Sequence, residues 1–138
     1  MATERIDEGL WDQCRDLTAA APDNAPPGET GLLLGEIDGI KVRLMDGNWV
    51  RTHVSMEFHE AGNGMFTSWE KGLIPKGEAW LDDTVKSDNY KFNLYHELHE
   101  IRLMREGLDY DAVAHPRANA AEKILRRRWG NTDKSYRE

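Results

Sequence analysis

LYHELHEIRLMREGLDYDAVAHPRANAAEKIL, the stretch from Leu94 to Leu125, decides the fold because its apolar residues recur at helical spacing in two successive segments. Gly107 favours the left-handed conformation that ends a helix, and Asp109 can cap the start of a second helix. The second segment carries a stripe of small residues suited to close helix packing: Ala114, Ala118, Ala121 and Leu125. The stretch therefore predicts an antiparallel helical hairpin over residues 91–129.

Polar side chains recur on one face of each predicted helix. His96 and Glu100 are four residues apart, so they project from the same side of the first helix. His115, Asn119 and Glu122 share one side of the second helix in the same way. Because the two helices fold back on each other, we expect the two polar faces to meet.

Two imidazoles and a carboxylate suit a divalent metal ion, zinc or else iron or manganese, and leave a coordination position open for water. We expect His96, Glu100 and His115 to be the ligands. Glu97 is turned about 100 degrees around the helix from His96, where it can act as general base on that water. Metal binding requires neutral imidazoles, so it should fail as the pH falls through about 6.

Several features of the same stretch leave alternatives open. Glu122 and Asn119 are either a further ligand or partners that orient the imidazoles. Pro116 either kinks the second helix or marks its start, with His115 as the entry residue. His99 faces the surface or a substrate rather than the metal. Histidine and glutamate on a helix can also simply face water, which is the alternative to a metal site.

The segment His96-Glu97-Leu98-His99-Glu100 resembles the active-site helix of zincin metallopeptidases, which carries His-Glu-x-x-His with the histidines as ligands and the glutamate as base. Glu100 stands here where that family has its second histidine. Residues 46–51 and the Ala-His-x-x-Ala-Asn-x-x-Glu order of residues 114–122 add to the likeness. From about residue 40 to 125 the chain is similar to small uncharacterised zincin-like proteins of phages and prophages.

This resemblance implies a peptide or protein substrate bound in a cleft. Residues 74–83 resemble the edge strand that lines a zincin cleft and pairs with extended substrate. Trp80 lies in this segment and is the tryptophan that we expect to form a wall of the cleft. The other tryptophans are scattered along the chain, so we assign them to core packing.

The rest of the chain predicts a single α+β domain over residues 1–138 with a small antiparallel or mixed sheet. Residues 1–20 form an N-terminal helix capped by Thr3, 21–30 a proline-rich loop, 31–90 the sheet region and 130–138 a tail. Within the sheet region we expect a hairpin of two strands, Ile40–Leu44 and Val50–Phe58, joined by a turn at 46–48. A second turn at 61–64 and a short strand at 74–81 follow.

Composition excludes several classes of function. The net charge of −7 argues against broad contact with a nucleic-acid backbone, and the basic residues near the C-terminus are read as helix-capping or solvated charges. The single cysteine, Cys14, permits no disulfide framework and is assigned to packing. No apolar run approaches the roughly 20 residues of a membrane span, and the first residues lack a signal-peptide order, so we expect a cytoplasmic protein.

Together these patterns predict a metal-dependent, peptidase-like hydrolase in which Glu97 activates a metal-bound water. A second hypothesis is a non-catalytic protein-binding module, such as a phage or host regulator, stabilised by the same metal. A third is an acidic binding module without metal. The oligomeric state is left open by the sequence.

Overall fold

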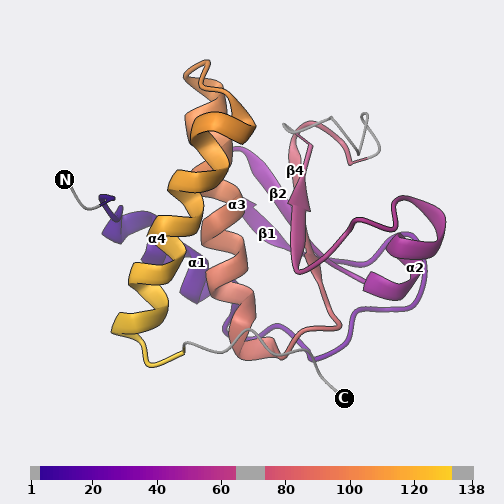
Figure 1. Cartoon of the computed structure of the whole chain (residues 1–138). Coiled ribbons are helices and arrows are strands. Elements are labelled where there is room, and N and C mark those ends of the chain that lie inside the picture. Colours follow the sequence, from indigo (N-terminus) through magenta and orange to yellow (C-terminus); the bar gives the residue numbers. More distant parts are fainter. Residues whose placement is uncertain (1–3, 65–73, 132–138) are drawn as a thin grey trace.

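A computed structural model describes residues 4–64 and 74–131 and shows an α+β fold in which a mixed four-stranded sheet is covered by helices (Figure 1). The helices are α1 (Glu8–Thr18), α2 (Gly47–His53), α3 (Tyr90–Arg105) and α4 (His115–Arg128), and the strands are β1 (Leu32–Ile37), β2 (Ile40–Met45), β3 (Ala61–Asn63) and β4 (Glu78–Asp82). The fold class that the sequence predicts, with an N-terminal helix, a small sheet and C-terminal helices, is confirmed.

The sheet has the strand order β1-β2-β4-β3. The tight turn at Asp38 and Gly39, both at positive φ, joins β1 to β2 in an antiparallel hairpin. Strand β2 then pairs with β4 in parallel, and β4 pairs with β3 antiparallel. Ile40, Val42 and Leu44 alternate along β2 as predicted, and all three side chains are buried.

The predicted hairpin between Ile40–Leu44 and Val50–Phe58 is wrong, because residues 47–53 form helix α2 and β2 pairs with β1 instead. Asp46 does not open a turn but caps this helix, since its side chain accepts a hydrogen bond from the backbone N–H of Trp49. The predicted turn at 61–64 is also corrected, because residues 61–63 pair with β4 as strand β3.

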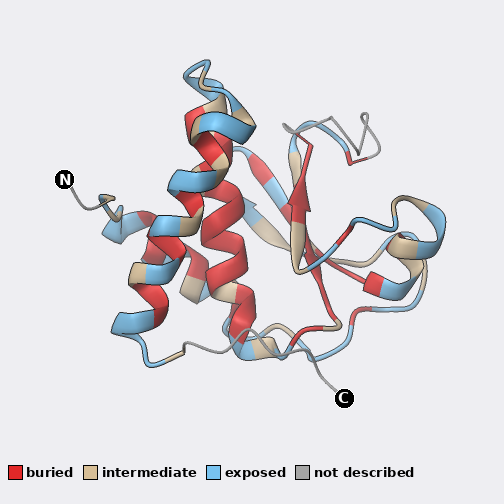
Figure 2. Cartoon of the chain, in the orientation of Figure 1, coloured by how far each residue is buried: buried red, intermediate tan, exposed pale blue. Residues whose placement is uncertain are grey.

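Helices α1, α3 and α4 lie on one side of the sheet and α2 lies on the other (Figure 1). Helix α3 is the centre of the main core, and Figure 2 shows it buried along almost its whole length. Trp11 of α1 packs on Phe92 and Tyr95 of α3, with ring centroids 5.2 and 6.1 Å apart. Cys14 is fully buried in this core, as predicted, and burial raises the pKa of its thiol.

The predicted helical hairpin is present. Helix α3 ends before Gly107, which has φ +89°, and Asp109 accepts a hydrogen bond from the N–H of Ala112. Residues 110–114 form a π-helical turn, and α4 begins at His115. Pro116 thus stands at the second residue of α4, directly after the π-helical turn.

The other predicted boundaries shift by a few residues. Helix α1 is capped by Asp7, while Thr3, the predicted cap, lies outside the described residues. Strand β4 starts at Glu78, later than the predicted residue 74. Within the described ranges, none of the helices combines the length and apolar character needed to cross a bilayer.

Candidate metal site

Three side chains of the helical hairpin converge on one point. Nε2 of His96 lies 2.7 Å from Oε2 of Glu100, and Nδ1 of His115 lies 2.6 Å from the same oxygen. One potential ligand atom from each of these residues lies within 4.8 Å of the other two. The structure therefore brings together the three residues that the sequence analysis assigned as ligands.

Local geometry explains this convergence. His96 and Glu100 occupy successive turns of α3, so their side chains share one face of that helix. His115 is held at the first position of α4 by the preceding π-helical turn, and Tyr110 from that turn stacks on its ring at 5.1 Å. The Tyr110 hydroxyl lies 3.2 Å from Nδ1 of His115. Glu100 is 1% exposed, whereas the His115 side chain is 41% exposed, so the cluster has a buried and an open side.

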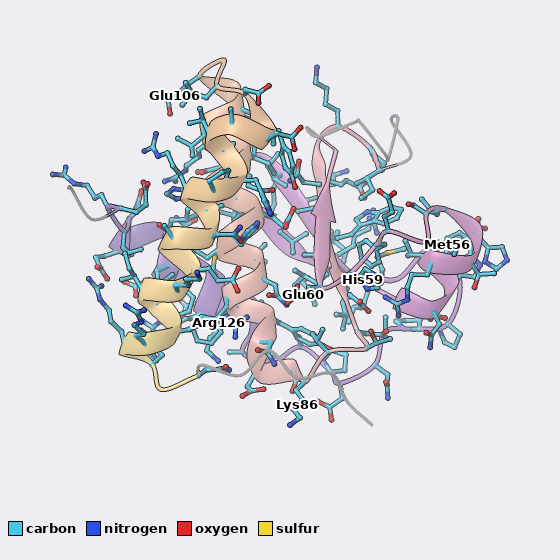
Figure 3. All side chains as sticks on the ribbon, viewed as in Figure 1. Met56, His59, Glu60, Lys86, Glu106 and Arg126 are labelled. Carbon is cyan, nitrogen blue, oxygen red and sulfur yellow. The ribbon has the colours of Figure 1, made fainter. Side chains whose placement is uncertain are left out.

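The open side faces a cavity of about 330 Å³ between the helical hairpin and the sheet. Its wall consists of Glu57, His59, Glu60, Ala61, Gly62, Asn63, Asn93, His96, Glu97, Glu100, Tyr110, His115, Asn119 and Glu122. In Figure 3, Glu60 lies between the sheet and α3. Five of the lining residues identified in the described part of the chain are glutamates and none is lysine or arginine, so the cavity is acidic.

Glu97 also lines this cavity and is 7% exposed. The side-chain amide of Asn63, on β3, donates hydrogen bonds to Oε1 of Glu97 at 2.8 Å and to Oε1 of Glu100 at 3.2 Å. Asn63 thus holds both carboxylates from the sheet side. Glu97 thus lies beside the cluster, in the wall of the same cavity.

Glu122 lies behind His96. Its Oε1 is 2.9 Å from Nδ1 of His96, although that ring nitrogen has no well-aligned hydrogen bond among the described residues. Its Oε2 accepts a hydrogen bond from Nε of Arg126 at 2.8 Å. Nε2 of His96 faces Glu100, whereas Nδ1 faces Glu122. Glu122 is therefore placed to orient the His96 ring from the side away from Glu100. Asn119 lines the cavity from α4.

Charges around His96 shift its titration. Burial alone would lower the pKa of His96, but the carboxylates of Glu100 and Glu122, with the negative charge of Glu97, raise it to about 10. Burial would raise the pKa of Glu100, but the imidazoles of His115 and His96 hold it below its ordinary value. The proton on His96 balances buried negative charge. A cation bound by the ligand atoms of His96, Glu100 and His115 would take over that role.

Two residues predicted to border a cleft are placed elsewhere. Trp80 packs with Met45, Val50, Phe58 and Ile74 in a second core cluster and does not line the cavity. The strand that carries it, β4, is an inner strand between β2 and β3, so the expectation that residues 74–83 form the edge is corrected.

The edge strand beside the cavity is β3, which contributes Ala61, Gly62 and Asn63 to the wall. His99, the second predicted cleft residue, lies near Glu4 at 3.5 Å, and its ring lies 5.6 Å from that of Tyr95. It is not among the residues that form the cavity wall.

Sequence reasoning missed several cavity residues. Asn63 was assigned to a turn because of its glycine neighbours, and Asn93 and Tyr110 carried no signal beyond their positions in the hairpin. His59 also lines the cavity, together with Glu57 and Glu60. No pattern in segment 57–60 indicates that it lies beside the helical hairpin.

The donor set fits a small divalent cation. Two nitrogens and one oxygen suit zinc, iron or manganese, and bonds of about 2.1 Å at tetrahedral angles separate two zinc ligands by about 3.4 Å. The contacts of 2.6 and 2.7 Å would have to lengthen by under about 1 Å to admit such an ion. No family model, curated protein or solved structure matches this chain, so the assignment rests on the geometry.

Proposed function

We propose that the protein is a metal-dependent hydrolase of peptidase-like type that binds one divalent ion, zinc or else iron or manganese, through His96, Glu100 and His115. The observation that carries this proposal is the convergence of their three ligand atoms at the wall of an open cavity. A structural zinc site is closed by four protein ligands, whereas a catalytic site keeps a position for water or substrate.

Glu97 is the proposed general base. It lines the same cavity as the three ligands, and the Asn63 amide fixes one of its oxygens at 2.8 Å. A metal ion held by the three ligands would make a bound water more acidic, and the carboxylate of Glu97 would accept the proton of that water. The likeness of His96-Glu97 to the zincin active-site helix supports the same role.

A peptide substrate is supported by the edge of the sheet. Among the described strands, β3 is the last in the sheet and pairs with β4, and its residues border the cavity. An extended chain can pair with such an edge through backbone hydrogen bonds. The acidic wall favours substrates with basic side chains, and we place the reaction in the cytoplasm.

The test compares Glu97→Gln with wild type in metal content and in hydrolysis of a library of basic peptides. Untagged wild-type protein should carry about one equivalent of zinc, iron or manganese and cleave some members of the library. Glu97→Gln should keep the metal and lose turnover. The double variant His96→Ala, His115→Ala should lose both. His53→Ala, at an exposed position of α2, should lose neither.

The alternative is a metal-stabilised, non-catalytic module that binds a protein. It is favoured by the burial of Glu100, whose single oxygen joins α3 to α4. In that case metal would raise the stability, and no peptide would be cleaved by wild type. A wild type that takes up no metal after reconstitution would remove both proposals in favour of a metal-free acidic binding module.

A further inference from the structure

The side chain of Asn93 has a buried amide nitrogen that finds no hydrogen-bond partner among the described residues. Asn93 lies on α3 one turn before His96, is 3% exposed and contributes to the cavity wall. Its Nδ2 makes no hydrogen bond to any described residue. Leaving a buried donor unsatisfied costs about 1–3 kcal/mol, so such an atom in a folded protein calls for an explanation.

Arg126 determines which way this amide points. Nη2 of Arg126 donates to Oδ1 of Asn93 at 3.2 Å, and a guanidinium offers only donors, so the amide must turn its oxygen toward the arginine. The NH₂ group is therefore directed away from Arg126. Exchanging the two amide atoms would set donor against donor.

Arg126 is itself held firmly. It is 4% exposed, and its other hydrogen bonds go to Glu122 at 2.8 Å, Asn89 at 2.7 Å and Asn131 at 3.0 Å. Its guanidinium also lies over the ring of Phe92 at 4.6 Å. Figure 3 shows Arg126 on α4. Its contacts with Phe92 and Asn93 join it to α3. The sequence predicts a solvated or helix-capping charge at this position, and the burial of Arg126 corrects that prediction.

We propose that Nδ2 of Asn93 donates a hydrogen bond to an oxygen of the substrate, the carbonyl oxygen of the bond that is hydrolysed, and that Arg126 is the residue that positions it. This inference rests on the proposed function. Asn93 and His96 are three residues apart on α3 and share one face of the helix, so a carbonyl bound beside the metal cluster can be reached from both.

The N–H group of Asn93 stabilises the carbonyl oxygen most when negative charge develops on it during the reaction. Attack of the water oxygen on the carbonyl carbon moves the π electron pair of the C=O bond onto its oxygen, and Glu97 takes the proton released by the water. Collapse of this intermediate restores the C=O bond and breaks the C–N bond, and the leaving amine takes the proton from Glu97. A fixed N–H group stabilises the negative oxygen more than the neutral carbonyl.

The test uses a peptide phosphonamidate, in which a charged phosphonyl oxygen replaces the attacked carbonyl oxygen, and measures its binding to zinc-loaded protein by calorimetry. Asn93→Ala and the isosteric Asn93→Asp should each weaken binding by about 10- to 100-fold or more, with zinc content and folding retained. Asn93→Asp keeps the oxygen that Arg126 needs, so it guards against loss of the fold.

Asn89 offers a matched control. It also accepts a hydrogen bond from Arg126 through Oδ1, but its amide nitrogen donates to the Lys86 carbonyl and it is not part of the cavity wall. Asn89→Asp should change the affinity by no more than about twofold. In ¹⁵N-labelled wild type, the side-chain NH₂ resonances of Asn93 should shift on binding and those of Asn89 should not.

Equal binding of the analogue by wild type and both Asn93 variants would overturn the inference. Failure of zinc-loaded wild type to bind the analogue would overturn it together with the proposed function. An analogue that binds through Asn93 to a protein that cleaves no peptide would keep Asn93 as a donor to a bound oxygen but would overturn its role in hydrolysis together with the proposed function.

Discussion

Nδ1 of His115 lies 2.6 Å from Oε2 of Glu100, and this contact joins the start of α4 to the second half of α3. The carboxylate is almost fully buried, so its charge must be balanced where it stands. A proton on a neighbouring imidazole or a bound cation can do this. The stability of the hairpin and the occupancy of the proposed site are therefore linked.

Replacing Glu100 with Gln removes the charge that both histidines face. We expect Glu100→Gln to lose its equivalent of metal, measured by elemental analysis, because a neutral amide is a far weaker ligand. The metal-free variant should also unfold more easily, by about 3 kcal/mol, because an imidazolium would be left without its buried partner. Urea denaturation measures this loss.

Glu106→Gln, at the exposed end of α3, is the control and should match wild type in both measurements. Full metal content in Glu100→Gln would show that Glu100 is not a ligand.

The raised pKa of His96 predicts how zinc binding depends on pH. Its pKa is about 10 in the folded protein, above the ordinary value of 6.5, so the proton is present at neutral pH and must leave before Nε2 can bind metal. Zinc binding at about pH 7.5 should release close to one proton from this residue, and affinity should rise with pH up to about 10. Calorimetry in buffers of different ionisation enthalpy measures the proton release.

The same shift sets the stability of the metal-free protein. A folded pKa above the unfolded one stabilises the protein fully below about pH 6.5, and this contribution disappears as the pH rises through about 10. The expectation that metal binding fails only below about pH 6 assumed a histidine with an ordinary pKa. Because the carboxylates around His96 raise its pKa, protons compete with metal for this imidazole up to a higher pH. Zinc binding without proton uptake or release would contradict the protonated His96.

Gly47, at the start of α2, has no room for a side chain. A Cβ atom there would lie 1.9 Å from Oδ1 of Asp82 and 2.7 Å from its Cγ. That carboxylate is fixed, because it also accepts hydrogen bonds from Arg51 and from Thr84. Gly47→Ala should therefore destabilise the protein by about 1–3 kcal/mol in urea denaturation, although alanine is the better helix former.

Gly77→Ala is the matched control, since a Cβ at Gly77 meets nothing within 4 Å. It should change the free energy of unfolding by less than about 0.5 kcal/mol. A Gly47→Ala protein as stable as wild type would mean that α2 does not pack on Asp82 in solution.

Helix α2 shows why part of the fold was not predictable. Val50, Thr52 and Val54 alternate as in a strand, but Val50 and Val54 are also four residues apart, so the same apolar positions satisfy a helix. What decides between the two is distant in sequence: the N–H of Gly47 donates to Asp83 at 3.0 Å. No local pattern reports such a contact.

The helical hairpin was predictable because its signals are local. Gly107 at positive φ, the cap at Asp109 and the small-residue stripe of α4 each act within a few residues. They also placed His96 and His115 on facing surfaces. Asn63 and Asn93 were missed because their roles depend on contacts with Glu97 and Arg126 that span 34 and 33 residues.

Asp7 anchors the N-terminal helix through its charge. One carboxylate oxygen accepts the N–H of Leu10 at 2.9 Å and the other pairs with Arg102 of α3, and these contacts hold the pKa of Asp7 below its ordinary value. A lowered folded pKa stabilises the protein above about pH 4 and ceases to do so as the pH falls through that lower value.

At pH 7, Asp7→Ala should cost about 1 kcal/mol, as expected for a lost N-cap, and Asp7→Asn should cost less because asparagine still caps. The difference between wild type and Asp7→Asn should shrink as urea denaturation is repeated down to about pH 3, since the asparagine cannot titrate. A difference that stays constant over this range would mean that the carboxylate of Asp7 acts only as a neutral cap, and that its pairing with Arg102 does not help to hold α1 on α3.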